Sequence, residues 1–229
     1  MSDTTTDLPL REACLQEAMR IIETDGLEKL SLREVSRRLG VSHQAPYKHF
    51  ASRDHILASI IEMTFAEFTK HMEDRSQKSD PALELRALGL AYVDYALANP
   101  IKYRLMFSAS LPHNTVHPEM LHQADRCFAL LHDCLSRLDY AKRPEVDRTL
   151  LERDAMVIWT QIHGLVTAMT SDAMPTMPIS KETQANAISH ALMRIDTIIQ
   201  GAPPSNAKLE ELKVTIKRDF PGLLAWQTI

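Results

Sequence analysis

The sequence has no long hydrophobic run and no leading segment of the kind that directs export. Even the most apolar segment, residues 155–169, contains Thr, Gln and His, so no stretch of 18 apolar residues exists and a membrane-spanning helix is not expected. The first nine residues are polar and acidic, whereas a secretory signal needs a positively charged region followed by an apolar one. We therefore expect a soluble, cytoplasmic protein.

Cysteine is also scarce, since the chain has only Cys14, Cys127 and Cys134. An odd number of cysteines without an export signal indicates a reducing compartment and no disulfide framework. We expect these residues to be small, buried and apolar, with a redox sensor or a metal site as the alternative for Cys127 and Cys134. The sequence lacks CxxC and HExxH spacings, a nucleophile elbow and a paired-carboxylate motif. It therefore predicts no catalytic residue, no metal and no cofactor.

What the chain does contain is helix-forming sequence. Only 6 of its 229 residues are glycine, 45% are apolar, and no strand-like alternation occurs. An all-α fold is the prediction. Later helices are predicted to start at Ser52, at Asp80-Pro81, at Asn99-Pro100 and at Ser180, and two more to span about Glu119–Ala141 and about Glu145–Ala173. A loop is expected over residues 108–118, and a last amphipathic helix after a Pro/Ser linker at residues 202–206.

Three short helices are predicted near the N-terminus. The first covers Leu10–Thr24 and ends at Asp25-Gly26. The second starts with a capping box, in which the Ser31 hydroxyl and the Glu34 carboxylate each accept from the other residue's amide, and stops at Gly40. A third is expected from an N-cap at Ser42 to near Phe50. Its Pro46 lies where only the first intrahelical bond is lost. Helix, glycine turn and helix form a helix-turn-helix arrangement.

Charge is unevenly distributed along the chain. The net charge is −4, yet the segment from Ser31 to Arg53 carries five positive side chains against one negative, Glu34, which gives +4 and leaves −8 on the rest. A small basic face on an acidic body is compatible with a nucleic-acid partner. Within this face, Arg37 and Arg38 are expected to be merely solvated.

Two parts of the sequence resemble a known family. The segment GLEKLSLREVSRRLGVSHQAPYKHFASRDHILASI, residues 26–60, resembles the DNA-binding head of the TetR/AcrR family of transcriptional regulators, most specifically at YKHF. NPIKYRLMF (99–107) and WTQIHG (159–164) look like landmarks of a subgroup whose regulatory domain is named for its Trp, His and Gly. The chain departs from the family at Ser31, which keeps the hydroxyl of the usual Thr, and at Pro46, where a proline would change how the reading helix sits.

The expected DNA contacts follow from side-chain chemistry. Glutamine can pair with adenine, histidine can donate to guanine, and alanine can contact a thymine methyl group. We predict that the base-reading residues are His43, Gln44 and Ala45. We predict that the phosphate contacts are Ser31, Arg33, Ser42, Tyr47, Lys48, His49 and Arg53. Packing in the small core is an equal alternative for Tyr47 and the expected role of Phe50.

The remaining helices are expected to form a dimerisation and effector-binding domain. One head contacts only a few base pairs, so a homodimer on palindromic double-stranded DNA is implied. The predicted interface residues are Leu165, Ile188, Leu192, Ile195 and Ile199, in an intersubunit four-helix bundle of the kind the resemblance also implies. The predicted pocket for an apolar or aromatic effector is lined by Tyr103, Met106, Phe128, Met156, Trp159, His163 and Met169. His163 could equally satisfy a buried carbonyl.

These expectations define four regions and one leading function. The regions are a disordered N-terminal tail (1–9), a helix-turn-helix DNA-binding domain (10–55), a helical ligand-binding and dimerisation domain (56–201), and a linker with an amphipathic tail (202–229). The leading function is a ligand-responsive transcriptional repressor that an effector releases from its operator. The alternatives are an architectural DNA-binding protein without an effector and a carrier of apolar molecules.

Overall fold

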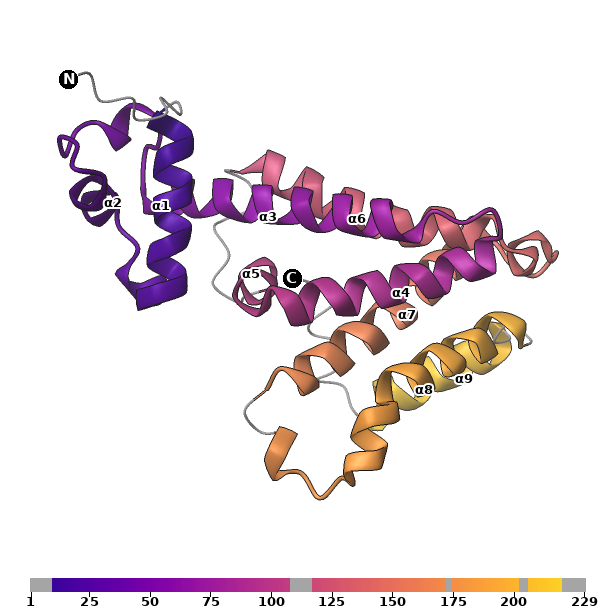
Figure 1. Ribbon diagram of the computed structural model, residues 1–229. Helices are drawn as coiled ribbons and strands as arrows, with labels where there is room; N and C mark the ends of the chain where they lie inside the picture. The colour runs from indigo at the N-terminus through magenta and orange to yellow at the C-terminus, as the bar shows by residue number, and fades with distance from the viewer. Residues whose placement is uncertain (1–9, 108–116, 172–173, 202–205, 220–229) are drawn as a thin grey trace.

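The computed structural model of the chain describes residues 10–107, 117–171, 174–201 and 206–219. Its α-helices form an elongated molecule with two parts (Figure 1). The α-helices are α1 (Leu10–Asp25), α2 (Leu32–Leu39), α3 (Arg53–Ser76), α4 (Pro81–Ala98), α5 (Pro100–Met106), α6 (Pro118–Ser136), α7 (Arg148–Met169), α8 (Lys181–Gln200) and α9 (Asn206–Asp219). Short 3-10 helices are η1 (Leu27–Lys29), η2 (Pro46–Lys48), η4 (Asp139–Lys142) and η5 (Met174–Thr176). The predicted all-α fold is confirmed. The predicted N-terminal tail, most of the loop at 108–118, most of the linker at 202–206 and the last ten residues lie outside the described residues.

Side-chain caps fix where most of the helices begin. The Ser31 hydroxyl accepts from the amide of Glu34, that of Ser52 from His55, and that of Ser180 from Thr183. The Asp80 carboxylate accepts from the amide of Ala82 at the start of α4. Each cap satisfies an amide that has no partner inside its own helix. The predicted helix starts at these four residues are therefore confirmed.

Two predicted helix boundaries need correction. The helix expected from Glu119 to Ala141 stops at Ser136 and is followed by the separate η4. The helix expected from Glu145 to Ala173 is α7, which starts three residues later because the Asp147 carboxylate accepts from the amide of Leu150 and caps it there.

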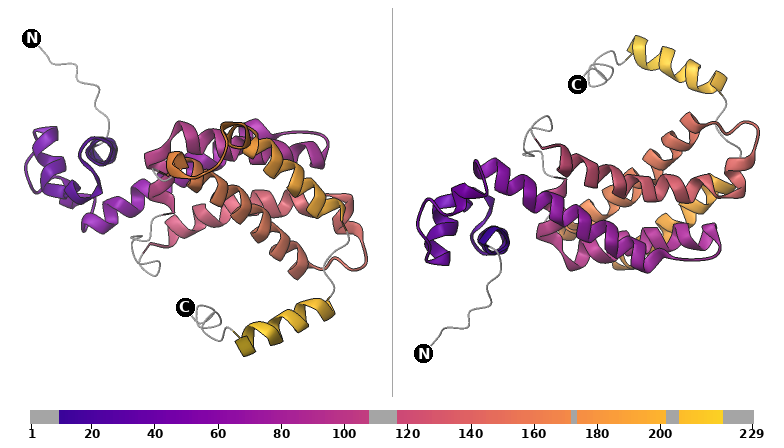
Figure 2. Two further views of the ribbon diagram at one scale, coloured as in Figure 1. Left: turned by 90° about the horizontal axis from the view of Figure 1, so that it is seen from below. Right: turned by 90° about the horizontal axis from the view of Figure 1, so that it is seen from above.

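Helix α3 connects the two parts of the molecule, as both views in Figure 2 show. The head contains α1, η1, α2 and η2, and the body contains the later helices up to α8. Its 24 residues extend for about 36 Å. The N-terminal turns carry Ile56 and Leu57, which are buried with α1 and α2 in the head. The C-terminal turns carry Phe68 and Met72, which are buried in the body against α4 and α6. One continuous helix thus packs against both parts of the molecule.

The body consists of α3 to α8. Helices α3, α4 and α6 pack closely together, α7 contacts α4 and α6, and α8 packs against α7. Helix α9 lies apart from these helices in both views of Figure 2. Within the described residues, no helix is both long enough and apolar enough to cross a membrane.

Candidate functional site

The turn between α2 and the next segment is a glycine-dependent helix end. Gly40 has φ 66° and ψ 24°, in the left-handed region that costs a residue without Cβ little. Its amide donates to the Arg37 carbonyl, and the Val41 amide donates to the Ser36 carbonyl at 3.1 Å. This pattern is a Schellman motif, which ends α2 and reverses the chain. After the turn, residues 42–49 lie at the surface of the head.

The segment after this turn is not the α-helix that the sequence predicts. Its regular part is the 3-10 helix η2, whose N-cap is Ala45 and not Ser42. The reason is Pro46, which has no amide hydrogen to donate to the Ser42 carbonyl four residues earlier. That carbonyl instead accepts from the Ala45 amide at 3.0 Å, and the Lys48 amide donates to Ala45 at 3.3 Å. Proline has therefore converted the predicted reading helix into tighter turns.

Most predicted DNA-contacting side chains of this segment face solvent. His43, Gln44, Tyr47, Lys48 and His49 are exposed, as Ser42 is, while Ala45 is half-buried. Tyr47 is 52% exposed, so it is not part of the core. Phe50 is fully buried, which confirms its predicted packing role. The segment thus exposes polar and aromatic groups on both sides of Ala45 and Pro46, next to the buried Phe50.

A buried serine orients His43. The Ser36 hydroxyl is buried and donates its only hydrogen to the Arg33 carbonyl at 2.8 Å. Its oxygen also lies 3.2 Å from His43 Nδ1, so His43 Nδ1–H must be the donor in that contact. The neutral ring then offers Nε2 as a hydrogen-bond acceptor. Neutral His43 is therefore suited to accept from the amino groups of adenine or cytosine. This differs from the sequence-based prediction, in which His43 donates to guanine.

Two of the positive charges on the head are neutralised by neighbours. The Glu34 carboxylate accepts from Arg37 at 2.6 Å and from Arg38 at 2.9 Å, and these hydrogen bonds lower the pKa of Glu34 to about 2. It therefore does not complete the predicted capping box, of which only the Ser31 half forms. Arg38 also pairs with Asp25 and, at 3.7 Å, with Glu17. Arg37 and Arg38 are thus ion-paired, in contrast to the expectation that they are merely solvated.

The remaining cations of the segment from Ser31 to Arg53 have two different surroundings. Within the part of the chain that the structure describes, Arg33 and Lys48 are exposed and form no ion pair, so both are free to meet phosphates. Arg53 instead donates to the Leu30 carbonyl at 3.1 Å and to the Leu27 carbonyl at 2.9 Å. These bonds attach the start of α3 to η1. Arg53 therefore has a structural role that its predicted phosphate contact did not include.

The body contains a large apolar cavity among α3, α4, α6, α7 and α8. Its volume is about 460 Å³. The lining residues are Phe65, Met72, Leu85, Leu88, Gly89, Tyr92, Phe107, Ala124, Cys127, Phe128, Leu130, Leu131, Met156, Ile158, Trp159, Ile162, Leu192 and Ile195. Small-molecule sites usually have volumes of about 300–1,000 Å³ and mostly apolar walls. We call this space the effector cavity, after the role that the sequence predicts for a pocket in this domain.

The predicted pocket residues divide into two groups. Phe128, Met156 and Trp159 line the effector cavity. Tyr103, Met106, His163 and Met169 are not among its lining residues. Tyr103 and His163 lie directly behind the wall, whereas Met106 is buried in the core and Met169 is half-buried near the end of α7.

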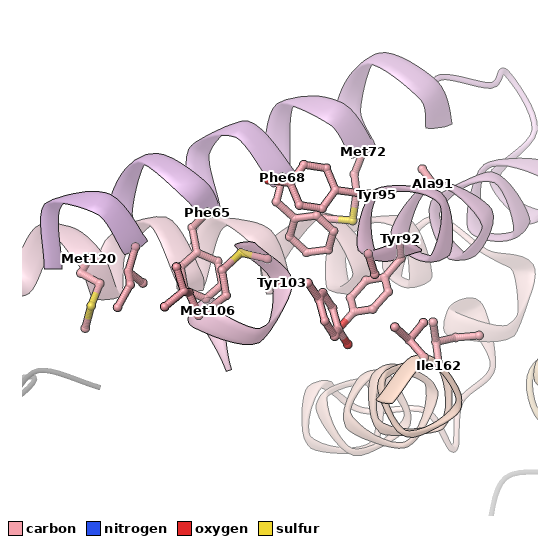
Figure 3. Packing of buried hydrophobic residues seen from close by; sticks show 14 of the residues in the cluster. Phe65, Phe68, Met72, Ala91, Tyr92, Tyr95, Tyr103, Met106, Met120 and Ile162 are labelled. Carbon is pink, nitrogen blue, oxygen red and sulfur yellow. The ribbon is translucent and has the colours of Figure 1, made fainter. Parts of the chain in front are cut away.

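A polar cluster of Tyr92, Tyr103 and His163 lies on one side of this cavity, and Figure 3 shows the two tyrosines side by side. The Tyr92 and Tyr103 hydroxyls lie 3.1 Å apart, and His163 Nδ1 lies 3.0 Å from the first and 2.7 Å from the second. Burial lowers the pKa of His163, so the ring is neutral near pH 7, and burial raises the pKa of both tyrosines. His163 thus satisfies buried hydroxyls instead of a carbonyl. The sequence argument missed Tyr92, because nothing in its spacing distinguishes it from an ordinary core residue of α4.

The predicted dimer residues mostly face inward. Ile195 and Ile199 are buried inside the subunit, and Leu192 lines the effector cavity. Leu165 and Ile188 are half-buried. The exposed large apolar side chains on these two helices are instead Met156 and Val157, on α7, and Met193, on α8. Gly164 is exposed on α7, and a Cβ there would meet no atom within 4 Å.

The chain is similar to known proteins in sequence and in fold. Residues 15–60 match the family model of bacterial regulatory proteins of the tetR family, and residues 85–192 match the tetracyclin repressor-like C-terminal domain. Together the two matches span more than half of the chain. No curated protein matches this sequence.

Solved structures share the architecture. A protein of unknown function from Rhodococcus sp. RHA1 is 25% identical over 89% of this chain and all of its own, with a TM-score of 0.68. The TetR family transcriptional regulator PfmR from Thermus thermophilus is 22% identical over 83% of this chain and 99% of its own, with a TM-score of 0.57. The fatty acid degradation regulator FadR from Bacillus halodurans is 14% identical over 85% of this chain and 96% of its own, with a TM-score of 0.60.

Proposed function

Because the chain belongs to the TetR family of bacterial regulatory proteins, we propose that it is a cytoplasmic repressor that binds a palindromic operator as a homodimer and is released by a small apolar effector. One observation carries this proposal: a single helix, α3, connects the part of the chain with the exposed segment 42–49 to an apolar cavity. A protein that only shapes DNA would not need the cavity. A protein that only carries apolar molecules would not need the head.

The head supports DNA binding through separate groups for affinity and for specificity. Arg33 and Lys48 are free cations suited to phosphates, which supply affinity that does not depend on sequence. His43 and Gln44 are exposed on the same segment and reach outward, as base-edge contacts require. One segment of this size covers few base pairs, so two heads, about 34–36 Å apart or a multiple of that distance, are needed for a specific site.

The dimer is proposed to form through the exposed stripe on α7 and α8. Val157 and Met193 are 49% and 60% exposed in the single chain, and Gly164 leaves space for a second helix to approach. These residues replace the inward-facing Ile195 and Ile199 in the interface that we propose. Leu165 and Ile188, half-buried at the edge of the stripe, remain part of it.

Effector binding is proposed to act on the head through α3. Phe65 and Met72, both on α3, line the effector cavity. The Phe65 ring packs edge-on against Phe107 at 5.8 Å, and Phe107 packs against His163 at 4.7 Å. A ligand that favours one packing of these rings also favours one position of α3. By linkage, operator DNA then weakens effector binding by the same factor.

The test is selection of bound duplexes from a random DNA pool by the full chain at a stated salt concentration. We expect a palindrome, and we expect apolar compounds screened on that duplex to release the protein. A folded, dimeric protein that selects no sequence would contradict the DNA-reading role. A selected palindrome that no compound releases, although compounds bind the protein, would contradict the effector role.

A further inference from the structure

Among the residues that the structure describes, the walls of the effector cavity carry no ionisable group that is charged near neutral pH. None of the lining residues is Asp, Glu, Lys, Arg or His. Burial raises the pKa of the Cys127 thiol to about 12, so this lining group is neutral as well. Charged residues of the same helices pair with each other away from the cavity wall, as Arg86 does with Asp196 at 2.7 Å and Arg137 with Glu84 at 2.6 Å. An ion inside the cavity would find no partner.

An unpaired ion in such a place is unfavourable. Transfer of a carboxylate or an ammonium group from water into a protein interior costs several kcal/mol unless an opposite charge or several hydrogen bonds compensate it. The effector cavity provides neither of these around most of its surface. The apolar part of a ligand, by contrast, is favoured by contact with Leu88, Phe128 and Ile162.

Among the described lining residues of the cavity, the side chains with oxygen or nitrogen atoms are Tyr92 and Trp159. Behind Tyr92 lie Tyr103 and His163, whose contacts with it at 3.1 and 3.0 Å hold its hydroxyl in place. A tyrosine oxygen can accept two hydrogen bonds and donate one. The side of the cavity at Tyr92 can therefore hold one uncharged polar group of a ligand.

We propose that the ligand of the effector cavity is an uncharged, largely apolar molecule whose single hydroxyl or carbonyl group meets Tyr92 and Trp159. The proposal rests on the proposed effector role of the cavity. It distinguishes neutral alcohols, phenols and ketones from fatty-acid anions and from lipophilic amines of the same size. Charge, and not chain length, is the property that the cavity selects against.

The direct test is a titration of Trp159 fluorescence. The chain has two tryptophans, Trp159 and Trp226, so Trp226→Phe leaves Trp159 as the only reporter. The probes are 1-decanol, decanoate and decylammonium, which share one alkyl chain and differ in charge. We expect 1-decanol to bind at least about tenfold more tightly than either ion. Equal binding of the three probes, tighter binding of an ion, or no binding of 1-decanol to the folded protein would overturn the proposal.

Two variants test the reasons for this selectivity. Tyr92→Phe removes only the hydroxyl, and we expect this variant to bind 1-decanol about three- to tenfold more weakly. Met156 lines the cavity yet is 46% exposed, so Met156→Lys can bring a positive charge to its rim without disturbing the core. We expect Met156→Lys to bind decanoate at least about tenfold more tightly than the unaltered protein does, and its control Met156→Leu to show no such gain. A decanoate affinity that stays unchanged in Met156→Lys would contradict the electrostatic argument.

Failure of this proposal and failure of the proposed function can be told apart. Operator binding is measured on the free protein, without any probe. If the free protein selects a palindrome and decanoate binds as well as 1-decanol, only the selectivity argument fails. If 1-decanol binds selectively but no DNA is selected, the regulatory role fails while the chemistry of the cavity stands.

Discussion

At the scale of single residues, Ser36 determines which hydrogen-bonding atom His43 presents. Ser36→Ala removes the acceptor of Nδ1–H and lets the imidazole ring turn. We expect the preference at the base pair read by His43 to fall by about 1 kcal/mol, or about fivefold, while binding to unrelated DNA stays unchanged. The measurement is affinity for the selected duplex and for its single-base-pair variants. His43→Ala is the control that identifies the base pair. An unaltered preference in Ser36→Ala would show that the serine does not orient the ring.

Gln44 and Lys48 are predicted to serve different functions although both are exposed on one segment. Gln44→Ala should relax specificity at one base position by about 1–3 kcal/mol. Lys48→Ala should weaken binding to all DNA sequences alike. It should also reduce the slope of log affinity against log salt concentration by about one, because one phosphate contact is lost. Binding isotherms at several salt concentrations separate the two effects. The same behaviour in both variants would contradict the division of roles.

His163 should make the body sensitive to acid. Burial lowers its pKa in the folded protein, so between that value and the value of an unfolded histidine, about 6.5, the unfolded chain binds more protons. Its contribution to stability is therefore present above about pH 6.5 and is lost as the pH falls below it. We expect the free energy of unfolding in urea to drop less between pH 7.5 and 5.5 in His163→Gln than in the unaltered protein. Equal losses in both proteins would contradict a buried, neutral His163.

At the scale of secondary-structure elements, Arg53 joins the start of α3 to η1 through two backbone carbonyls. Arg53→Lys keeps the charge but cannot reproduce two hydrogen bonds from one guanidinium group. We expect a loss of about 1 kcal/mol in the free energy of unfolding, since the side chain is partly solvated. Arg33→Lys, on the exposed face of α2, is the control and should change stability by less than half of that. Comparable losses in both variants would show that the carbonyl contacts contribute little.

Local sequence signals predicted where most helices begin, but not the exact form and end of every helix. Helix starts at Ser31, Ser52 and Asp80 were predictable because a cap is formed by residues two or three positions apart. The change of residues 42–50 from a helix to η2 was foreseeable only in part. Pro46 shows which bond is lost, but the rearrangement that satisfies the Ser42 carbonyl depends on the whole turn.

Contacts between distant parts of the chain were beyond the sequence argument. Arg38 is neutralised by Glu17 and Asp25, which lie outside the basic segment and reach it only because α1 packs against α2. The same holds for the cavity. Phe128 and Trp159 were predictable as aromatic residues of the body, whereas Tyr92 belongs to the site only because α4, α5 and α7 converge there. The inward orientation of Ile195 and Ile199 likewise depends on how α8 packs.

At the scale of the whole molecule, the proposed dimer makes the exposed stripe on α7 essential. Val157→Glu would place a charge in the proposed interface, and we expect the dimer dissociation constant to rise at least about 100-fold while helix content stays the same. The matched control is Leu83→Glu on α4, because Leu83 and Val157 are both 49% exposed. Sedimentation equilibrium measures both variants. Monomer formation in Leu83→Glu but not in Val157→Glu would place the interface elsewhere.

The continuity of α3 also makes it a lever. Phe65 at the cavity lies twelve residues after Arg53, about 18 Å along the helix axis. A tilt of about 6° at the cavity would displace the start of the helix by about 2 Å. Two-fold symmetry would double this to about 4 Å between the heads, which exceeds the roughly 3.4 Å between successive base pairs. A ligand that turns one helix by a few degrees would thus move both heads out of step with the grooves, with no need to unfold either of them.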